Sequence, residues 1–328
     1  MKRLIAEFEK QSFVQMVFPH AKTDWKDYLE EARATFVAII NAITRFEPLL
    51  LVCVNVEEAK RYFKDTNNII FVSYESDDTW ARDISAISVQ EDAEVKLYDF
   101  TFNAWGGKFE ATKDNALTQA LKHHYSCEVV QQDFILEGGA IESNGKGVLL
   151  TTAACMFNPN RNQLSKEQTI QKLKEFFGLE EVFYLKNGYL AGDDTDSHID
   201  TLARFVSEDT IMYVAPPPKE DEHYEALTKM EKELQNIAKE HNFKLIPLPF
   251  CDAVFYEDER LPATYANFLM LNGGVVVPTY GVSQDAAALK IFKEFFTDKE
   301  VVAVDCSTLI RQHGSLHCVT MQFHCNKK

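Results

Sequence analysis

Apolar residues recur at three- and four-residue intervals in five stretches of the chain, which is the spacing of one buried face of an α-helix. In the first stretch this face includes Trp25, Phe36 and Ile40. A short run of apolar and β-branched residues follows each stretch and predicts a strand. The predicted helices span residues 24–46, 113–124, 165–177, 219–240 and 284–296, and the predicted strands span residues 69–74, 127–131, 182–185, 243–248 and 301–305.

A polar loop follows each predicted strand, so that helix, strand and loop recur along the chain. Neighbouring loops are 51 to 69 residues apart, close to one fifth of the 328 residues. Because a unit of this size cannot bury both of its faces alone, the pattern predicts one α/β domain, residues 1–328, whose units close around an axis. The alternative is a doubly wound open sheet, but no Gly-x-Gly-x-x-Gly motif follows the first strand to support a nucleotide site. One polar residue from each loop marks the recurrence, in the order Asp83, Glu137, His198, Asn267 and Cys318.

Length and composition are those of an ordinary globular protein with a sizeable core, since 46% of the residues are apolar and 12% are aromatic. The N-terminus lacks the apolar stretch of a signal peptide, and no window approaches the roughly 20 apolar residues of a membrane span. We therefore expect a cytoplasmic protein. The seven cysteines are scattered and form no Cys-x-x-Cys pair, which argues against a disulfide framework and a zinc ribbon.

The formal charge of −16 excludes nucleic acid and anionic membrane as partners, because both bind through basic patches, and it favours a small cationic ligand. Residues 77–83 follow an apolar strand and bring charged and aromatic side chains together. They contain three carboxylates, a guanidinium and the indole of Trp80. A helix N-cap or a surface salt bridge would explain the carboxylates alone. A tryptophan among carboxylates suits the binding of an alkyl cation, which makes Asp83 and Trp80 candidate site residues.

Two further loops pair acids with a glycine turn or a histidine. Glu137 ends an apolar run and precedes two glycines, so its carboxylate is expected to be partly buried, which is costly unless it meets a cation or a histidine. His198 and Asp200 alternate around Ile199. If this segment is extended, their side chains point to the same face, as a paired base and carboxylate require. A lone His-x-Asp is also common without any chemical role.

Cys318 is expected at the start of a strand late in the chain, after a glycine turn. A neighbouring imidazolium and a loop rich in backbone amides would lower the pKa of this thiol from about 8.5 and supply thiolate. A buried structural cysteine is the alternative. A metal site is another, because five histidines and cysteines lie close together, although their spacing does not match structural zinc sites. These residues are His313, His317, Cys318, His324 and Cys325.

Four motifs together identify a resemblance that covers nearly the entire chain. They are Trp-x-Arg-Asp at 80–83, Glu-Gly-Gly at 137–139, His-Ile-Asp at 198–200 and Gly-Ser-Leu-His-Cys at 314–318. In this order, and with Phe-Pro-His at 18–20, the sequence resembles the agmatine deiminases and the bacterial-type peptidylarginine deiminases of the guanidine-modifying superfamily, and it is closest to the agmatine deiminases. The resemblance implies a five-bladed α/β propeller of ββαβ units. Two departures affect loop shape: His313 replaces the first glycine of the usual pair, and Ser85-Ala86 replaces a frequent Gly-Pro.

The resemblance also implies residue roles, no cofactor, no metal and a homo-oligomer. Cys318 would be the nucleophile and His198 the general acid and base. Asp83 and Asp200 would clamp the guanidinium, and Glu137 would contact either the substrate or the histidine. Trp80 would cover the alkyl chain of the substrate, and Asp194 would bind its far amine.

The chemistry of a guanidinium explains why these residue types are needed. Its central carbon is a poor electrophile, so two carboxylates must hold it planar beside the sulfur. Thiolate attack and proton donation from His198 would release ammonia and leave a covalent thiouronium, which water then hydrolyses. Nearby carboxylates are expected to raise the pKa of His198 and keep it charged for the first step.

The acidic loop 193–196 favours agmatine, which ends in an ammonium group, over free arginine, whose carboxylate needs a cation. The expected products are N-carbamoylputrescine and ammonia. Within the same chemistry, a peptidylarginine deiminase, an arginine deiminase and an amidinotransferase remain alternatives. Outside it, the chain could be a polyamine- or guanidine-binding protein without catalytic activity.

Overall fold

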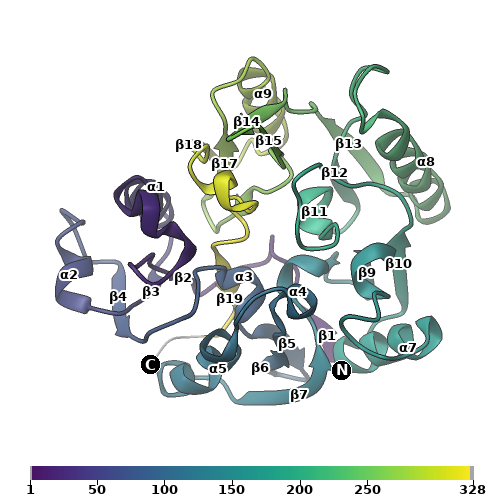
Figure 1. The fold of residues 1–328 in the computed structure, drawn as a ribbon. Helices are drawn as coiled ribbons and strands as arrows, with labels where there is room; N and C mark the ends of the chain where they lie inside the picture. Colours follow the sequence, from purple (N-terminus) through teal and green to yellow (C-terminus); the bar gives the residue numbers. More distant parts are fainter. Residues whose placement is uncertain (1, 326–328) are drawn as a thin grey trace.

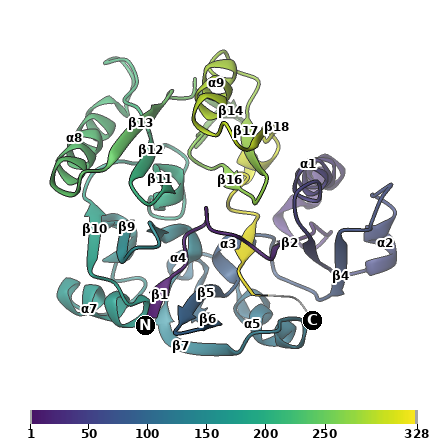
Figure 2. The same ribbon diagram turned by 180° about the vertical axis from the view of Figure 1, so that it is seen from behind.

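Mixed sheets, each flanked by helices, make up the computed structural model, which describes residues 2–325. Figure 1 shows the larger sheets around the middle of the molecule, with the long helices toward the outside. Figure 2 shows the same arrangement from behind, where the purple segment between β1 and β2 and the yellow C-terminal segment pass through the middle of the molecule. Within the described residues, five sheets have three or four strands and one is a two-stranded hairpin.

Four of the sheets share one chain order, in which an antiparallel pair is followed by a helix and a strand parallel to the second strand of the pair. A parallel pair needs such a crossover, and the helix covers the sheet. The four sequences are β5 (Ile87–Glu91), β6 (Glu94–Thr101), α5 (Thr112–Leu121) and β7 (Val129–Ile135); β8 (Glu142–Ser143), β9 (Val148–Thr152), α7 (Lys166–Phe177) and β10 (Glu181–Leu185); β11 (Ala203–Ser207), β12 (Thr210–Val214), α8 (Tyr224–His241) and β13 (Lys244–Leu248); and β16 (Leu269–Met270), β17 (Gly274–Thr279), α9 (Asp285–Phe295) and β18 (Glu300–Asp305).

The remaining large sheet joins the two ends of the chain. Its antiparallel pair combines β19 (Met321–Phe323) with β2 (Phe13–Val17). Strand β2 then leads through α1 (Leu29–Ile43) to the parallel strand β3 (Leu49–Cys53), and α2 (Val56–Lys60) leads to β4 (Ile69–Ser73). Strand β1 (Lys2–Leu4) pairs with β5 and forms the edge of that sheet. Both described ends of the chain are therefore held in sheets.

Short elements connect these units. Among residues 2–325, no helix combines the length and the apolar character needed to cross a membrane. The short elements are η1 (Asp24–Tyr28), α3 (Ala81–Ile84), α4 (Ala104–Gly107), η2 (Lys122–His124), η3 (Gly138–Ala140), α6 (Ala153–Met156), η4 (Ile199–Thr201), β14 (Val254–Tyr256), β15 (Glu259–Leu261) and η5 (Leu309–Gln312).

The predicted helices and strands are confirmed in position, with shifted ends. The first predicted helix divides into η1 and α1, and the last four correspond to α5, α7, α8 and α9. Helix α8 begins at Tyr224 rather than at residue 219, because residues 216–218 are prolines and Asp221 accepts a hydrogen bond from the amide of His223 just before the helix. Helix α7 is bounded by a capping box at Ser165 and by Gly178 in the left-handed conformation.

The five landmark loops contact one another in turn. The amide of Gly139 donates to Asp83, and Gly139 also lies against His198 and Asp200. Asn267 donates from its side-chain amide to the carbonyl of Asp200 and accepts from the amide of His317. The amide of Arg82 donates to the carbonyl of Cys318, 3.0 Å away, which returns the series to the first loop. Residues hundreds of positions apart are thereby brought to one place.

Candidate active site

A cavity of about 440 Å³, which we call the Cys318 cavity, lies where these loops meet. It is lined by Cys318, Asp83, Trp80 and Asp194, which the sequence predicted as site residues, together with aromatic side chains. The basic side chains in its lining are Lys22 and His313. The acidic side chains in its lining are Asp24, Asp77, Asp78, Asp83, Glu110, Asp114 and Asp194.

Cys318 is buried in a turn three residues before β19, rather than at the start of the strand as predicted. Its Sγ lies 3.5 Å from Oδ1 of Asn267, which is also 3.4 Å from the Cys318 amide. Burial, followed by the charges of Asp200 and Asp83, raises the thiol pKa well above its usual range. The predicted lowering of this pKa is therefore wrong for the protein without ligand, because His317 is bound to two carboxylates instead.

Asp83 belongs to the short helix α3, and its carboxylate is held by three neighbours from other elements. Its Oδ1 accepts from the Gly139 amide at 2.9 Å, and its Oδ2 accepts from the indole of Trp105 at 2.9 Å. The Nδ1 atom of His198 is 3.8 Å from Oδ2. The carboxylate is 5% exposed, so these contacts fix it at the cavity wall.

His198 and Asp200 lie close together, but the segment is not extended as the same-face argument assumed. His198 caps the 3₁₀ helix η4, which contains Asp200. A Cβ at Gly139 would lie 2.6 Å from Nδ1 of His198 and 3.1 Å from Oδ2 of Asp200, so only glycine permits this approach. Neither His198 Nε2 nor Asp200 Oδ1, both buried, has a hydrogen-bond partner among the described residues.

The pKa of His198 is raised, as predicted. Burial alone lowers it, but Asp83, Cys155 and Glu137 together outweigh this effect and raise the pKa well above its usual range. The ring is therefore charged at neutral pH. The Nδ1 atom of this ring lies 3.8 Å from Oδ2 of Asp83, which lines the cavity, so a charged imidazole can donate a proton to a ligand held at Asp83.

Glu137 lies on the histidine side of the site, outside the lining of the Cys318 cavity. Its Oε1 accepts from Nε of Arg161 at 2.8 Å, and Arg161 also pairs with Asp196. Burial raises the pKa of Glu137, which His198 and Arg161 partly offset. Of the two contacts predicted for Glu137, the structure brings it toward the histidine.

Trp80 and Asp194 both line the cavity. The Trp80 indole donates to Oδ2 of Asp78 at 3.0 Å. A Cβ at Gly314 would lie 2.2 Å from the Trp80 ring, so this glycine of the cysteine motif lets the ring pack on the backbone. Burial and the neighbouring Asp193 raise the pKa of Asp194.

The five residues of the metal alternative do not converge on one point within the described chain. His313 is bound to the carbonyl of Gly192, whereas His317 is bound to Asp200 and Glu7. The donor atoms that do converge belong to two other groups of three, of which only the second shares a residue, His317, with the five. Each group contains a glutamate already paired with an arginine, Arg161 or Arg204. A structural zinc site of the predicted set is not supported.

Two residues of the site were not singled out from the sequence as chemical. Asn267 marked a loop but was assigned no role, and Trp105 lies beside glycines that were read only as a failed nucleotide motif. Ala104, Trp105, Gly106 and Gly107 all have positive φ, which directs the Trp105 indole onto Asp83. Four consecutive residues with positive φ cannot be inferred from this composition.

The fold, the cysteine and the clustered carboxylates define a family of enzymes that act on guanidinium groups. A model of the Porphyromonas-type peptidyl-arginine deiminases matches residues 3–323, and the chain belongs to this family. A curated relative, the agmatine deiminase of Stutzerimonas stutzeri, is 33% identical over 97% of this chain and 94% of its own length.

Solved structures agree over the whole chain. A cysteine-to-serine variant of the agmatine deiminase of C. jejuni, with substrate bound, is 40% identical and superposes with a TM-score of 0.95 over 100% of this chain and 98% of that one. A protein from Porphyromonas gingivalis that carries the provisional name of an arginine deiminase is 44% identical, with a TM-score of 0.95 over 100% of this chain and 99% of that one.

Proposed function

We propose that this chain is an agmatine deiminase, which hydrolyses the guanidinium of agmatine to give N-carbamoylputrescine and ammonia. One observation carries the proposal: Cys318, Asp83 and Asp194 line the same cavity, so one elongated dication could reach all three. The named relatives support the same activity. The chemistry needs no cofactor. A cytoplasmic location and a homo-oligomer remain predictions.

We infer that the five large sheets are the blades of a five-bladed α/β propeller in a single domain. Three features support this inference. The strand and helix order repeats from sheet to sheet, the landmark loops contact one another in a circle, and β19 joins the sheet that contains β2. Such an arrangement places one loop of each blade at the axis, where the residues with chemical roles gather.

In the proposed mechanism, Asp83 and Asp200 bind the guanidinium. Asp200 Oδ1 is buried and has no partner among the described residues, as expected for an oxygen that receives a ligand N–H. Trp80 covers the alkyl chain and Asp194 binds the far ammonium. Glu137 acts on the reaction through His198 rather than through the substrate.

The bound cation generates the nucleophile. Asp83 and Asp200 raise the pKa of Cys318 in the free protein, and a guanidinium between them neutralises their effect and favours the thiolate. The thiol proton passes to solvent water, and the sulfur adds to the guanidinium carbon. His198 then donates its proton to one nitrogen, the carbon–nitrogen bond breaks, and ammonia departs, leaving a cationic thiouronium on Cys318.

Water completes the reaction. Neutral His198 takes a proton from water, and the resulting hydroxide adds to the thiouronium carbon. The carbon–sulfur bond then breaks and the added hydroxyl loses its proton to solvent water, which releases the neutral ureido product and returns the Cys318 thiolate. His198 is again protonated, so one histidine serves as acid in the first half and as base in the second.

The lining of the cavity favours agmatine over arginine. Agmatine is a dication, whereas the α-carboxylate of arginine needs a cationic partner. Seven acidic side chains line the cavity against Lys22 and His313, and the ammonium of Lys22 is already paired with Glu75. A catalytically silent binding protein would not need carboxylates that raise the pKa of a buried imidazole next to the ligand cavity.

A substrate panel tests the proposal. Purified protein is incubated with agmatine, arginine and a blocked arginine ester, and ammonia and ureido product are measured. We expect turnover of agmatine, and a fall on the order of ten-thousandfold or more in the Cys318→Ala variant. Asp194→Asn should raise the KM for agmatine about tenfold, while the neighbouring Asp193→Asn serves as a control for loop structure. Equal ammonia release by wild type and Cys318→Ala would refute the mechanism, and preferred turnover of arginine would refute the substrate.

A further inference from the structure

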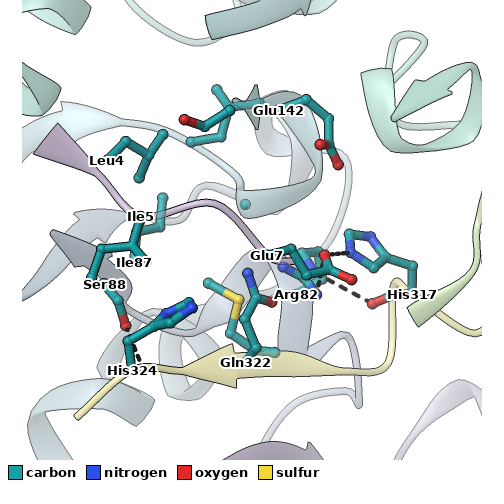
Figure 3. A pocket seen from close by; sticks show the side chains of 14 residues that line it. Leu4, Ile5, Glu7, Arg82, Ile87, Ser88, Glu142, His317, Gln322 and His324 are labelled. Atoms are coloured by element: carbon teal, nitrogen blue, oxygen red, sulfur yellow. Dashed lines mark hydrogen bonds and ion pairs between the residues drawn. The ribbon is translucent and has the colours of Figure 1, made fainter. Parts of the chain in front are cut away.

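A second group of charges touches Asp200 from outside the Cys318 cavity. It consists of Glu7, Arg82, Glu142, Arg204 and His317, all of which are at most 7% exposed, and we call it the buried charge cluster. Figure 3 shows Glu7, Arg82 and His317 pointing toward one another beside a cavity of about 40 Å³. Glu7 comes from the N-terminal segment, 310 residues before His317.

His317 bridges two carboxylates within this cluster. Its Nδ1 is 2.7 Å from Oδ2 of Asp200, and its Nε2 is 2.6 Å from Oε2 of Glu7. An ionised carboxylate only accepts hydrogen bonds, so both ring nitrogens must donate, and His317 is an imidazolium. Both oxygens of Glu7 are held, because Oε2 also accepts from Arg204 at 2.6 Å and Oε1 accepts from the amide of Met270 at 2.8 Å.

This bridge determines how Asp200 is presented. The bond to His317 occupies Oδ2 and leaves Oδ1 buried without a partner among residues 2–325. Burial of Asp200 raises its pKa, but His317 reverses the effect and the net pKa is lowered, so the carboxylate stays ionised. His317 also precedes Cys318, and Oδ1 of Asn267 accepts from the amides of both residues.

We propose that Glu7 and His317 are positioning residues of the deiminase reaction, a role that rests on the proposed function. Glu7 keeps His317 protonated, and the imidazolium keeps Asp200 ionised and turned so that Oδ1 faces the substrate guanidinium. A cation arriving at Asp200 weakens the hold of that carboxylate on the His317 proton. Glu7, which does not contact the substrate, supplies the compensating charge.

Two isosteric variants within the buried charge cluster separate this role from general stability. Glu7→Gln removes the charge that faces Nε2 of His317, whereas Glu142→Gln removes a charge that also pairs with Arg204 but forms no hydrogen bond to His317. We expect both to lower the melting temperature. Only Glu7→Gln should lower kcat/KM for agmatine, by roughly tenfold to a hundredfold. The charged groups around His317 are Glu7, Asp200, Glu142, Arg82 and Arg204, and the thiol of Cys318 is adjacent.

Two substitutions of His317 test which bond matters. An asparagine places an amide N–H near the position of Nδ1, facing Asp200, and a glutamine places one near Nε2, facing Glu7. His317→Asn should therefore retain at least tenfold more kcat/KM than His317→Gln. Agmatine affinity, measured by calorimetry in the Cys318→Ala background, should follow the same order.

The outcomes distinguish this inference from the proposed function. If wild type does not release ammonia from agmatine, the proposed function fails. If wild type is active but Glu7→Gln and Glu142→Gln have the same kcat/KM for agmatine, or His317→Gln equals His317→Asn in folded protein, the positioning role fails. Circular dichroism of every variant establishes that folded protein is being compared, and the His317 pair decides the matter if Glu7→Gln does not fold.

Discussion

Two charged regions, the Cys318 cavity and the buried charge cluster, meet at Asp200 and differ in what balances their carboxylates. In the cluster, Glu7 and Glu142 face Arg204 at hydrogen-bond distance, and Arg82 lies 3.7 Å from Glu7. In the Cys318 cavity, seven acidic side chains line a space with Lys22 and His313 as the basic ones. Buried carboxylates are stable only when paired, so the cluster is complete in itself while the cavity is completed by a cation.

The difference teaches which charges to associate with ligand binding. A carboxylate whose oxygens are both held by the protein, such as that of Glu7, supports structure. One that has a buried oxygen left over, such as that of Asp200, is prepared for a ligand. The predictions below change one region at a time, from the largest expected effect to the smallest.

Among changes to these two regions that leave the Cys318 nucleophile in place, removing the charge of Asp83 should cause the largest loss of activity. Asp83→Asn keeps the shape but weakens both the guanidinium clamp and the raised pKa of His198. We expect kcat/KM for agmatine to fall roughly a thousandfold, measured by ammonia release. Asp99→Asn is the matched control, since Asp99 is also buried but accepts from Gln119 outside the cavity. An Asp83→Asn enzyme within threefold of wild type would contradict the clamp.

Breaking the cluster should instead cost stability. Arg204→Met leaves Glu7 and Glu142 buried without their shared partner, and we expect the free energy of unfolding to fall by about 3–5 kcal/mol in urea titrations. Arg45→Met removes an exposed pair with Glu300, and a loss below about 1 kcal/mol is expected there. Similar losses in the two variants would mean that the cluster is not a structural charge group.

Gly139 lies where the two regions meet. A methyl group at Gly139 would press on His198, Asp83 and Asp200, with the nearest atom 2.6 Å away, so Gly139→Ala should lower kcat/KM about a hundredfold. Gly273→Ala is the control, because its Cβ would meet only the ring of Phe46, at 3.3 Å. Thermal unfolding and activity are measured on both. Unchanged activity in Gly139→Ala would show that the close approach of the three side chains is not needed.

The excess of acid in the cavity predicts a modest pH effect on binding. Burial raises the pKa of Asp78 to about 7 and that of Asp114 to about 8 in the free protein. A bound cation favours the ionised forms, so affinity for agmatine should rise, by at most about tenfold per pH unit, as pH increases from 6 to 8. Calorimetry on Cys318→Ala measures this, and Asp114→Asn should flatten the upper part of the rise. Affinity that falls over this range would contradict the prediction.

Local patterns were sufficient to locate the repeated elements. Apolar spacing placed α5, α7, α8 and α9 within a few residues of their observed positions, because one face of each helix packs on its sheet and must be apolar along its length. The helix predicted over 219–240 begins later than predicted. Prolines and a turn precede it, and apolar spacing carries no information about either.

The amino-acid sequence by itself determined the repeating α/β order and the residue types in each loop, including Cys318, His198, Asp83 and Asp200. Only the tertiary structure decided how these residues behave. The predicted low pKa of the Cys318 thiol was wrong because burial and two carboxylates surround it. Likewise, Glu7 acquires its contact with His317 only when the ends of the chain meet. The physical reason is that pKa values and hydrogen-bond partners depend on burial and distances between atoms, whereas spacing along the chain reports only local periodicity.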